Sequence, residues 1–381
     1  AFFYIAKKFL KFNKKIIFFF FLIFTLKVLV IVNIESVFVF PDEKKMYDCA
    51  ISRAGEDDAY GEMIYQQDGC YLMESYYLAF LEYAYKISPT YALIPRLINL
   101  ILYAFSALLV FKLSLILFKS ESIAKTAMIF FLIFPATNFW SLFILRETLM
   151  AGVFLAIFLF LILGLEVNKF FLLGSVFFLI VSFALRDLVW LIAVISFFIV
   201  KIFIFFINST KKTKTIFIII IFLLLLISTQ IKGVPEKTNF LVKQISDKRN
   251  ANDLGNFSFF ENLKFASVTD ILKFLPISFV YAVLSPLIPD YNNVYASVFF
   301  LFEAVPLYFI LASIFFSVNL FKEEKFFYII IFCLIYLTFI FVINGNIQTG
   351  LRYRSLLLPF LIILAAPFLN RIRIFNKFFI D

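Results

Sequence analysis

Long apolar runs separated by short polar stretches dominate the chain. Runs of about 18 or more apolar residues recur along it, the first over about 16–37 and the second over about 91–118. A helix of about 20 apolar residues is long enough to cross the hydrocarbon core of a bilayer. The pattern therefore predicts an all-α, polytopic membrane protein with about ten transmembrane helices.

The remaining predicted spans follow in order along the chain. They cover about 124–137, then runs ending at 165, 186 and 201, then 215–230, 294–320, 326–343 and 355–369. A shorter stretch, 76–86, has Tyr and Leu on one side and is predicted to form an interfacial amphipathic helix.

The segment 271–293 is apolar but contains Pro276, Pro286 and Pro289. A full span there would place the basic end of the chain outside, against the rule that Lys and Arg stay in the cytoplasm. A re-entrant or interfacial hairpin keeps that end inside, and we favour it.

Basic residues set the expected topology. The stretch 7–15 is rich in Lys and has no acid, and a second basic cluster, KKTK, lies at 211–214. Both are therefore expected in the cytoplasm. The chain is then one transmembrane domain over 1–381, with a first outer loop at 38–90 and a second outer loop with the re-entrant segment at 231–293. Cys49 and Cys70 share the first outer loop and can form a disulfide if it faces an oxidising compartment.

The composition supports a membrane protein and excludes several other classes of protein and site. The chain is 63% hydrophobic and 16% charged, with a mean hydropathy of +0.99, far above that of a soluble domain. The net charge of +10 comes from basic residues at the ends of apolar runs, which is a topology signal and does not indicate nucleic-acid binding. The chain has no His, which excludes His-based triads and His metal sites.

The stretch 134–150, FPATNFWSLFILRETLM, places Arg146 and Glu147 in apolar surroundings. Pro135 is expected to stop one helix, and Asn138 to cap the next, which puts Arg146 about 12 Å along that helix. A charge at that depth is costly in lipid and indicates a polar cavity or a partner. The alternative is an intrahelical ion pair that packs against a neighbouring helix.

On this topology, ionisable residues from distant parts of the chain gather at the outer leaflet. They are Asp42 and Glu43, Arg146 and Glu147, Arg186 and Asp187, and Arg352 and Arg354 on either side of Tyr353. Such a cluster predicts a functional site on one side of the membrane.

Each group in this cluster has a chemical role and a plainer alternative. Asp42 and Glu43 are the candidate catalytic pair, as a base or as ligands of Mg²⁺ or Mn²⁺; the alternative is a solvated loop charge. The four arginines are candidate phosphate ligands, because the guanidinium fork matches phosphate oxygens; the alternative is an anchor at the membrane interface. Glu147, Asp187 and Tyr353 are the candidate supporting residues.

Short motifs along nearly the whole chain resemble bacterial membrane glycosyltransferases of the GT-C type, which include relatives of protein mannosyltransferases and lipid A aminoarabinose transferases. The motifs are FPDEKKMYDCA at 40–50, YALIPRLINLILYAFSALLVFKL at 91–113, FPATNFWSLFILRETL at 134–149, ALRDLVW at 184–190, LSPLIP at 284–289 with Glu303, and GNIQTGLRYRSLLLPFLIILAA at 345–366.

The resemblance implies a sugar donor on a polyprenyl phosphate or diphosphate, handled at the outer face of the bacterial cytoplasmic membrane. It also implies that Asp42 and Glu43 serve as base or metal ligand. The acceptor stays open among a glycan, a lipid and a protein, because the loop at 231–270 matches no motif of the family.

Two other functions fit the sequence less well. A polysaccharide polymerase or ligase of the O-antigen type would depend on the arginines more than on Asp42. A flippase or transporter of lipid-linked oligosaccharides, which is not an enzyme, places its charges near the membrane midplane within broken helices. Here the charges are expected on one side, which disfavours transport.

Overall fold

The computed structural model describes most of the predicted helices. The described residues are 14–34, 43–44, 47–50, 75–87, 93–144, 146–185, 189–208, 242–243, 245–247, 249, 263–285, 300–343 and 347–372. Over these ranges the regular secondary structure is helical and contains no β-strand. The all-α prediction is confirmed.

The chain divides into two compact units. The first joins Ala1–Trp190, Phe309–Val318 and Ser355–Asp381, and the second joins Leu191–Tyr308 and Asn319–Arg354. The boundaries fall within α11 (Val189–Asn208), α16 (Val305–Ser317) and the short 3₁₀ helix η3 (Val318–Leu320), and after α18 (Ile347–Arg354). Each unit therefore draws on segments that are far apart in the sequence.

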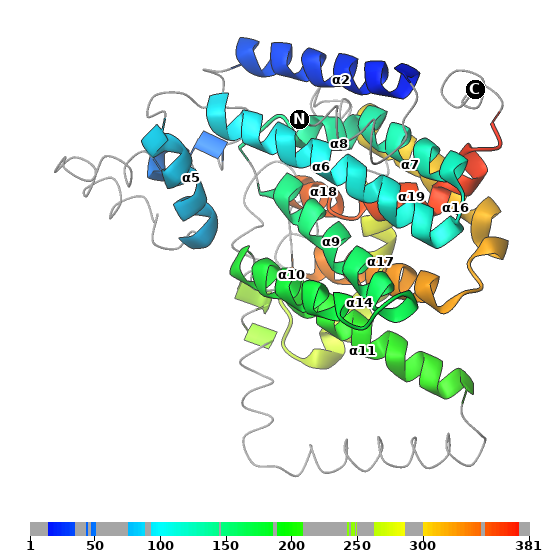
Figure 1. Cartoon of the computed structure of the whole chain (residues 1–381). Coiled ribbons are helices and arrows are strands. Elements are labelled where there is room, and N and C mark those ends of the chain that lie inside the picture. Colours follow the sequence, from blue (N-terminus) through cyan, green and yellow to red (C-terminus); the bar gives the residue numbers. More distant parts are fainter. Residues whose placement is uncertain are drawn as a thin grey trace. The chain divides into compact units, whose positions relative to one another are not determined.

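The first unit is a helical bundle built around α6. Its helices are α2 (Lys14–Asn33), α5 (Ser75–Ile87), α6 (Leu93–Phe118), α7 (Glu121–Ile133), α8 (Pro135–Trp140), α9 (Glu147–Glu166), α10 (Phe171–Leu185) and α19 (Leu358–Leu369). Helix α6 packs against α2, α7 and α9, while α10 packs on α9 and α19 packs on α7 (Figure 1). A helix is present at the predicted 76–86 stretch, as α5, and its interfacial position stays a prediction.

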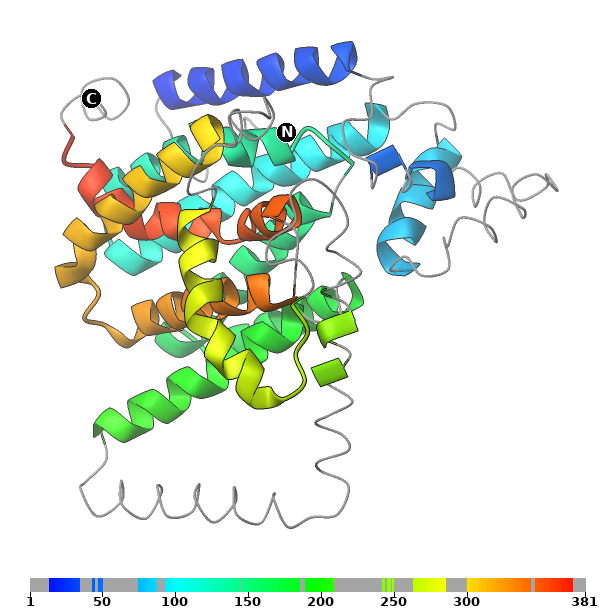
Figure 2. The same ribbon diagram turned by 180° about the vertical axis from the view of Figure 1, so that it is seen from behind.

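The second unit contains α11 (Val189–Asn208), α14 (Val268–Leu284), the π-helix η2 (Phe300–Ala304), α17 (Glu324–Ile343) and α18 (Ile347–Arg354). Helix α14, yellow-green in Figure 2, packs against α17 and also contacts α18. Helix α17 contacts α18 in turn. These three helices form the described core of the unit.

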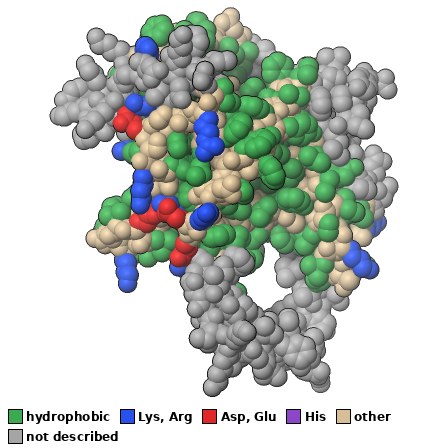
Figure 3. Space-filling model, turned by 90° about the vertical axis from the view of Figure 1, so that its right-hand side faces the viewer, with side chains coloured by type: hydrophobic (Ala, Val, Ile, Leu, Met, Phe, Trp, Pro, Cys, Tyr) green, Lys and Arg blue, Asp and Glu red, His purple; other side chains and the backbone are tan. Residues whose placement is uncertain are grey.

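Apolar side chains cover the outside of several helices. On α2 the Phe18 side chain is 65% exposed, and on α10 the Phe177 and Ile180 side chains are 58% and 62% exposed. Figure 3 shows that hydrophobic side chains make up most of the described surface on the face it presents. Water would penalise such a surface, whereas lipid chains would not.

Four helices within the described ranges are long and apolar enough to cross a membrane: Lys15–Asn33, Leu93–Phe118, Glu147–Glu166 and Leu301–Leu320. Phe171–Leu185 and Leu358–Leu369 are shorter apolar helices. The prediction of a polytopic membrane protein is confirmed. The span predicted at 215–230 lies outside the described residues, so the total of about ten stays a prediction.

The predicted hairpin at 271–293 begins as one continuous helix, α14. Ser267 and Asp270 form a capping box at its start: the Ser267 hydroxyl accepts the Asp270 N–H at 3.3 Å, and the Asp270 carboxylate accepts the Ser267 N–H at 3.0 Å. Pro276 was expected to interrupt the segment, yet it lies inside the helix. Residues 286–293 lie outside the described part, so the choice between span and hairpin stays a prediction.

Two glycines allow α9 and α10 to approach closely. A Cβ atom on Gly164 would lie 2.5 Å from a methyl carbon of Leu172, and a Cβ on Gly174 would lie 2.6 Å from the Phe160 ring. Small residues at such positions are the usual means of close helix contact in membranes.

We expect Gly174→Val to destabilise the first unit by about 1–3 kcal/mol, because the added side chain must displace the Phe160 ring. A lowered midpoint of thermal unfolding in detergent would measure this effect. Val176→Leu, on the exposed side of the same helix, is the control and should change stability by less than about 0.5 kcal/mol. Equal effects of the two changes would contradict the close packing.

Candidate functional site

The stretch 134–150 folds differently from the prediction. Helix α7 ends at Ile133, and Pro135 is the first residue of the short helix α8. Helix α9 begins only at Glu147, with Arg146 in the N-cap position. The prediction that Asn138 caps a long helix carrying Arg146 at 12 Å depth was wrong. Proline at the first helical position starts a helix as readily as it stops one.

Side chains near the break between α7 and α8 donate hydrogen bonds to the last carbonyls of α7. Pro135 has no N–H, so the Phe131 carbonyl has no helical donor. The hydroxyls of Tyr103 and Thr137 donate to that carbonyl, each at 2.8 Å. The Asn138 side chain donates to the Leu132 carbonyl at 2.8 Å. Tyr103 therefore ties α6 to the break between α7 and α8.

A buried ion pair with Arg96 fixes Glu43, one residue of the predicted acidic pair. Arg96 Nη2 and Nε lie 3.0 and 3.1 Å from Glu43 Oε1, and both side chains are fully buried. Arg96 Nη1 also donates to the Ile34 carbonyl at 2.5 Å, just beyond α2. The backbone N–H of Ile144 donates to Glu43 Oε1 at 2.9 Å. This ion pair thus joins the exit of α2, the first turn of α6 and the segment before α9.

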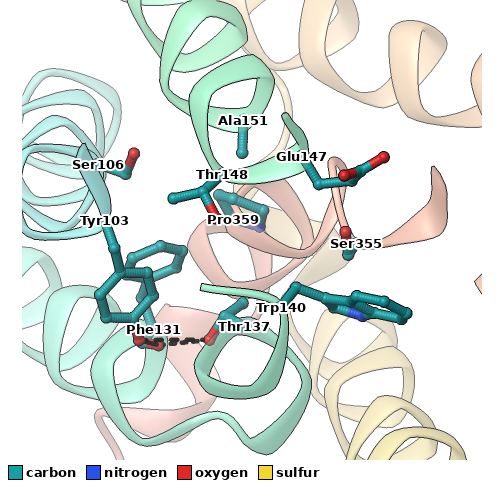
Figure 4. A pocket seen from close by; sticks show the side chains of 10 residues that line it. All are labelled: Tyr103, Ser106, Phe131, Thr137, Trp140, Glu147, Thr148, Ala151, Ser355 and Pro359. Atoms are coloured by element: carbon teal, nitrogen blue, oxygen red, sulfur yellow. Dashed lines mark hydrogen bonds between the residues drawn. The ribbon is translucent and has the colours of Figure 1, made fainter. Parts of the chain in front are cut away.

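A pocket lies in the first unit where α6, α7, α8 and α9 meet the start of α19. Its cavity volume is about 20 Å³, room for roughly one water molecule, and it is lined by Tyr103, Ser106, Phe131, Thr137, Trp140, Glu147, Thr148, Ala151, Ser355 and Pro359. Figure 4 shows Tyr103 and Phe131 on one side, Glu147, Ser355 and Trp140 on the other, and Thr148 and Pro359 between them. Glu147, a predicted supporting residue, therefore lines this pocket, and its side chain is only 1% exposed.

Lys27 was not among the residues predicted from the sequence. It is buried in α2, where its Nζ donates to the Ser141 hydroxyl at 2.6 Å and lies 3.3 Å from the centre of the Tyr103 ring. An isolated lysine within an apolar span is itself a signal of a functional position. Lys27 thus contacts Tyr103, one of the side chains that line the pocket.

The second unit contains another buried ion pair. Arg354 Nη2 lies 3.0 Å from Glu303 Oε1, and Nη1 donates to the carbonyls of Ala282 and Ser285 at 3.0 and 2.8 Å. Arg354, predicted as a phosphate ligand, therefore has several protein acceptors. Arg352, 8% exposed, is on the same helix, α18, and its phosphate role stays a prediction, as does the support from Tyr353.

Several predicted site residues lie outside the described part of the chain: Asp42, Arg186 and Asp187. Across the described ranges, no group of three or more His, Cys, Asp or Glu side chains could hold a metal ion. The predicted Mg²⁺ or Mn²⁺ site at Asp42 and Glu43 thus stays a prediction. Cys49 is disulfide-bonded and Cys333 is free, while Cys70 lies outside the described residues.

Comparison with known proteins supports the fold. No protein-family model and no curated protein matches the chain. The structure is similar to the crystal structure of ArnT from Cupriavidus metallidurans bound to undecaprenyl phosphate, with a TM-score of 0.58 and 14% sequence identity. The match covers 95% of this chain and 62% of that chain, so this chain spans less than two thirds of ArnT. The predicted polytopic, GT-C-like fold is confirmed.

We expect Arg96→Met to destabilise the first unit by about 3–5 kcal/mol, because it leaves the buried Glu43 carboxylate without its cation. The double variant Arg96→Met/Glu43→Gln should recover more than half of that loss, as measured by thermal unfolding of the four proteins of the cycle. Lys86→Met, which removes the partly exposed pair with Glu82, is the control and should cost less than about 1 kcal/mol. Strict additivity of the two changes would show that the pair carries no coupling.

Proposed function

We propose that the chain is a glycosyltransferase that moves a sugar from a polyprenyl phosphate or diphosphate donor to an acceptor at the outer face of a bacterial cytoplasmic membrane. The observation that carries the proposal is the fold similarity to ArnT over 95% of this chain. The ArnT crystal contains undecaprenyl phosphate, a lipid carrier of the class that we assign to this chain.

The position of Glu43 supports a catalytic role for its neighbour Asp42. Arg96 and the Ile144 N–H fix the Glu43 carboxylate against α6, and Asp42 directly precedes Glu43 in the sequence. In this proposal Asp42 activates the acceptor hydroxyl as a general base, and Glu43 acts as its support. No step requires a metal ion; Asp42 and Glu43 are the residues that would hold Mg²⁺ or Mn²⁺.

Arg146 is the proposed ligand of the departing phosphate. It precedes α9 directly, where the first N–H groups and the helix dipole favour an anion. It is also only two residues beyond Ile144, whose N–H binds Glu43. Glycosyl transfer needs both a base and a phosphate-binding group, because one activates the acceptor while the other stabilises the leaving group.

The outward orientation rests on the first loop. Cys49 lies within the predicted outer loop 38–90, and it is disulfide-bonded. Disulfides persist in oxidising compartments outside the cytoplasm. This agrees with the basic stretch at 7–15, which the positive-inside rule places in the cytoplasm.

Purified protein in liposomes, incubated with polyprenyl-phosphate sugars, should consume the donor and release polyprenyl phosphate. Asp42→Asn and Arg146→Ala should each lower this turnover at least about 100-fold, because general-base catalysis and phosphate stabilisation are each worth that much or more. Chromatography of the lipid products measures both. Asp57→Asn in the same loop and the exposed Arg371→Ala are the matched controls and should keep the wild-type rate.

Other outcomes identify the alternatives. Turnover that survives Asp42→Asn but not Arg146→Ala would favour a polymerase or ligase that joins preassembled chains. If no donor is consumed and a fluorescent lipid-linked sugar nevertheless crosses the vesicle membrane, the protein is a transporter and the proposed reaction is wrong.

A further inference from the structure

The chain between α8 and α9 leads directly to Arg146, the proposed phosphate ligand. Helix α8 ends at Trp140 and α9 begins at Glu147, and the described residues between them form turns and bends. We name residues 141–144 the connector. Irregular backbone in apolar surroundings needs hydrogen-bond partners from elsewhere in the fold. The position of Arg146 therefore depends on the groups that bind the connector.

Two buried side chains from different helices bind the connector. The Lys27 Nζ of α2 donates to the Ser141 hydroxyl at 2.6 Å, and that hydroxyl donates in turn to the Asn138 carbonyl at 2.8 Å. The Asn99 side-chain amide of α6 donates to the Phe143 carbonyl at 2.5 Å. Lys27 is 6% exposed and Asn99 is 1% exposed, so bulk water does not compete for these bonds.

A third bond fixes the end of the connector. The Ile144 N–H donates to the Glu43 carboxylate, which pairs with Arg96. Helix α2, helix α6 and Glu43 thus each bind a different residue of the connector, and all three bonds lie within five residues of Arg146. A guanidinium that is already held in place loses less conformational freedom when it binds a phosphate.

The chemistry of Lys27 favours a role beyond packing. Lys27 lies in a helix long and apolar enough to cross a membrane, which packs on α6 and α7 (Figure 1). Its other described buried side chains are apolar: Ile16, Phe20 and Ile31. A hydrocarbon side chain would fill the place of Lys27 without the cost of a cation in apolar surroundings. What a lysine adds there is the contact with the Tyr103 ring and the bond to Ser141.

We infer that Lys27 and Asn99 are positioning residues, which hold the connector so that Arg146 meets the phosphate of the lipid substrate. The inference rests on the proposed function, because it takes Arg146 as the phosphate ligand. Neither Lys27 nor Asn99 has to touch the lipid, since both act through residues 141–144.

Two other roles have different signatures. If Lys27 bound the phosphate itself, the effect of its loss would add to the effect of losing Arg146. If Lys27 and Asn99 only stabilised the fold, their loss would lower the unfolding temperature and would leave the affinity of the folded protein unchanged.

Equilibrium binding of sugar-free polyprenyl phosphate to the purified full chain in nanodiscs of neutral lipid measures the role without turnover. Arg146→Ala should weaken binding about tenfold or more, as expected for a lost hydrogen bond to a charged group. Lys27→Met and Asn99→Leu should each weaken it roughly three- to tenfold. Asn99→Leu leaves the net charge unchanged, so its effect cannot come from a lost Coulombic attraction.

The decisive measurement repeats both changes in the Arg146→Ala background. There Lys27→Met and Asn99→Leu should weaken binding less than about twofold further, because they act through the side chain that is already gone. Lys27→Arg keeps a donor for Ser141, so it should bind the lipid more tightly than Lys27→Met does.

Lys112→Met and Asn33→Leu are the matched controls. Lys112 is exposed on α6, and Asn33 is exposed at the end of α2, where its side chain donates to the Leu29 carbonyl of the same helix. Both variants should keep the wild-type affinity. Thermal unfolding of each variant checks that the protein is folded.

Three results would overturn the inference. Folded Lys27→Met and Asn99→Leu proteins could bind with wild-type affinity, their effects could add fully to that of Arg146→Ala, or Arg146→Ala itself could leave binding unchanged. Turnover of a polyprenyl-phosphate sugar is scored separately. Donor consumption without the coupling would keep the transferase and reject the positioning residues, whereas the coupling without donor consumption would do the reverse.

Discussion

The ion pair between Glu43 and Arg96 is the constraint on which the first unit depends. Either charge alone would cost several kcal/mol or more when buried in apolar surroundings. Together they are fully buried, and the Ile34 carbonyl and the Ile144 N–H use further hydrogen-bonding capacity of the pair. Because each partner needs the other, the chain after α2 and the segment before α9 must both fold against the first turn of α6.

The second constraint is the N–H that Pro135 lacks. Because this N–H is missing, the Phe131 carbonyl accepts hydrogen bonds from the Tyr103 and Thr137 hydroxyls. The same two side chains line the pocket. The turn that follows α8 ends where α9 begins, which puts Glu147 at the opposite wall. A break in a membrane helix thus creates a polar cavity, while side chains donate to the Phe131 and Leu132 carbonyls, as hydrocarbon surroundings demand.

The sequence predicted the positions of the helices well, but it did not predict the polar contacts at the helix ends. Apolar runs located α6 within two residues and α17 within two residues, since period and length are local properties. The positions of Asn138 and Arg146 relative to the helices were predicted wrongly. The end of α7 depends partly on Tyr103, which donates to the Phe131 carbonyl from 28 residues earlier in the sequence. Pairing of Arg96 with Glu43 spans 53 residues, and no local spacing encodes it. Glu43 and Glu147 were named from the sequence and their roles stay predictions, whereas Lys27 and the pocket were not predicted.

Two arginines show how a buried charge is to be weighed as evidence of function. Arg96 and Arg354 each pair with a glutamate and also donate to carbonyls at the end of a helix, α2 for Arg96 and α14 for Arg354. The last carbonyls of a helix have no intrahelical donor, so a nearby arginine satisfies them and interacts favourably with the helix dipole. An arginine held in this way already spends most of its donors on the protein. By contrast, Arg146 stands at a helix start, where the N–H groups attract the same anion that a guanidinium does. The helix end that an arginine faces thus separates a structural cation from a candidate phosphate ligand more sharply than its burial does.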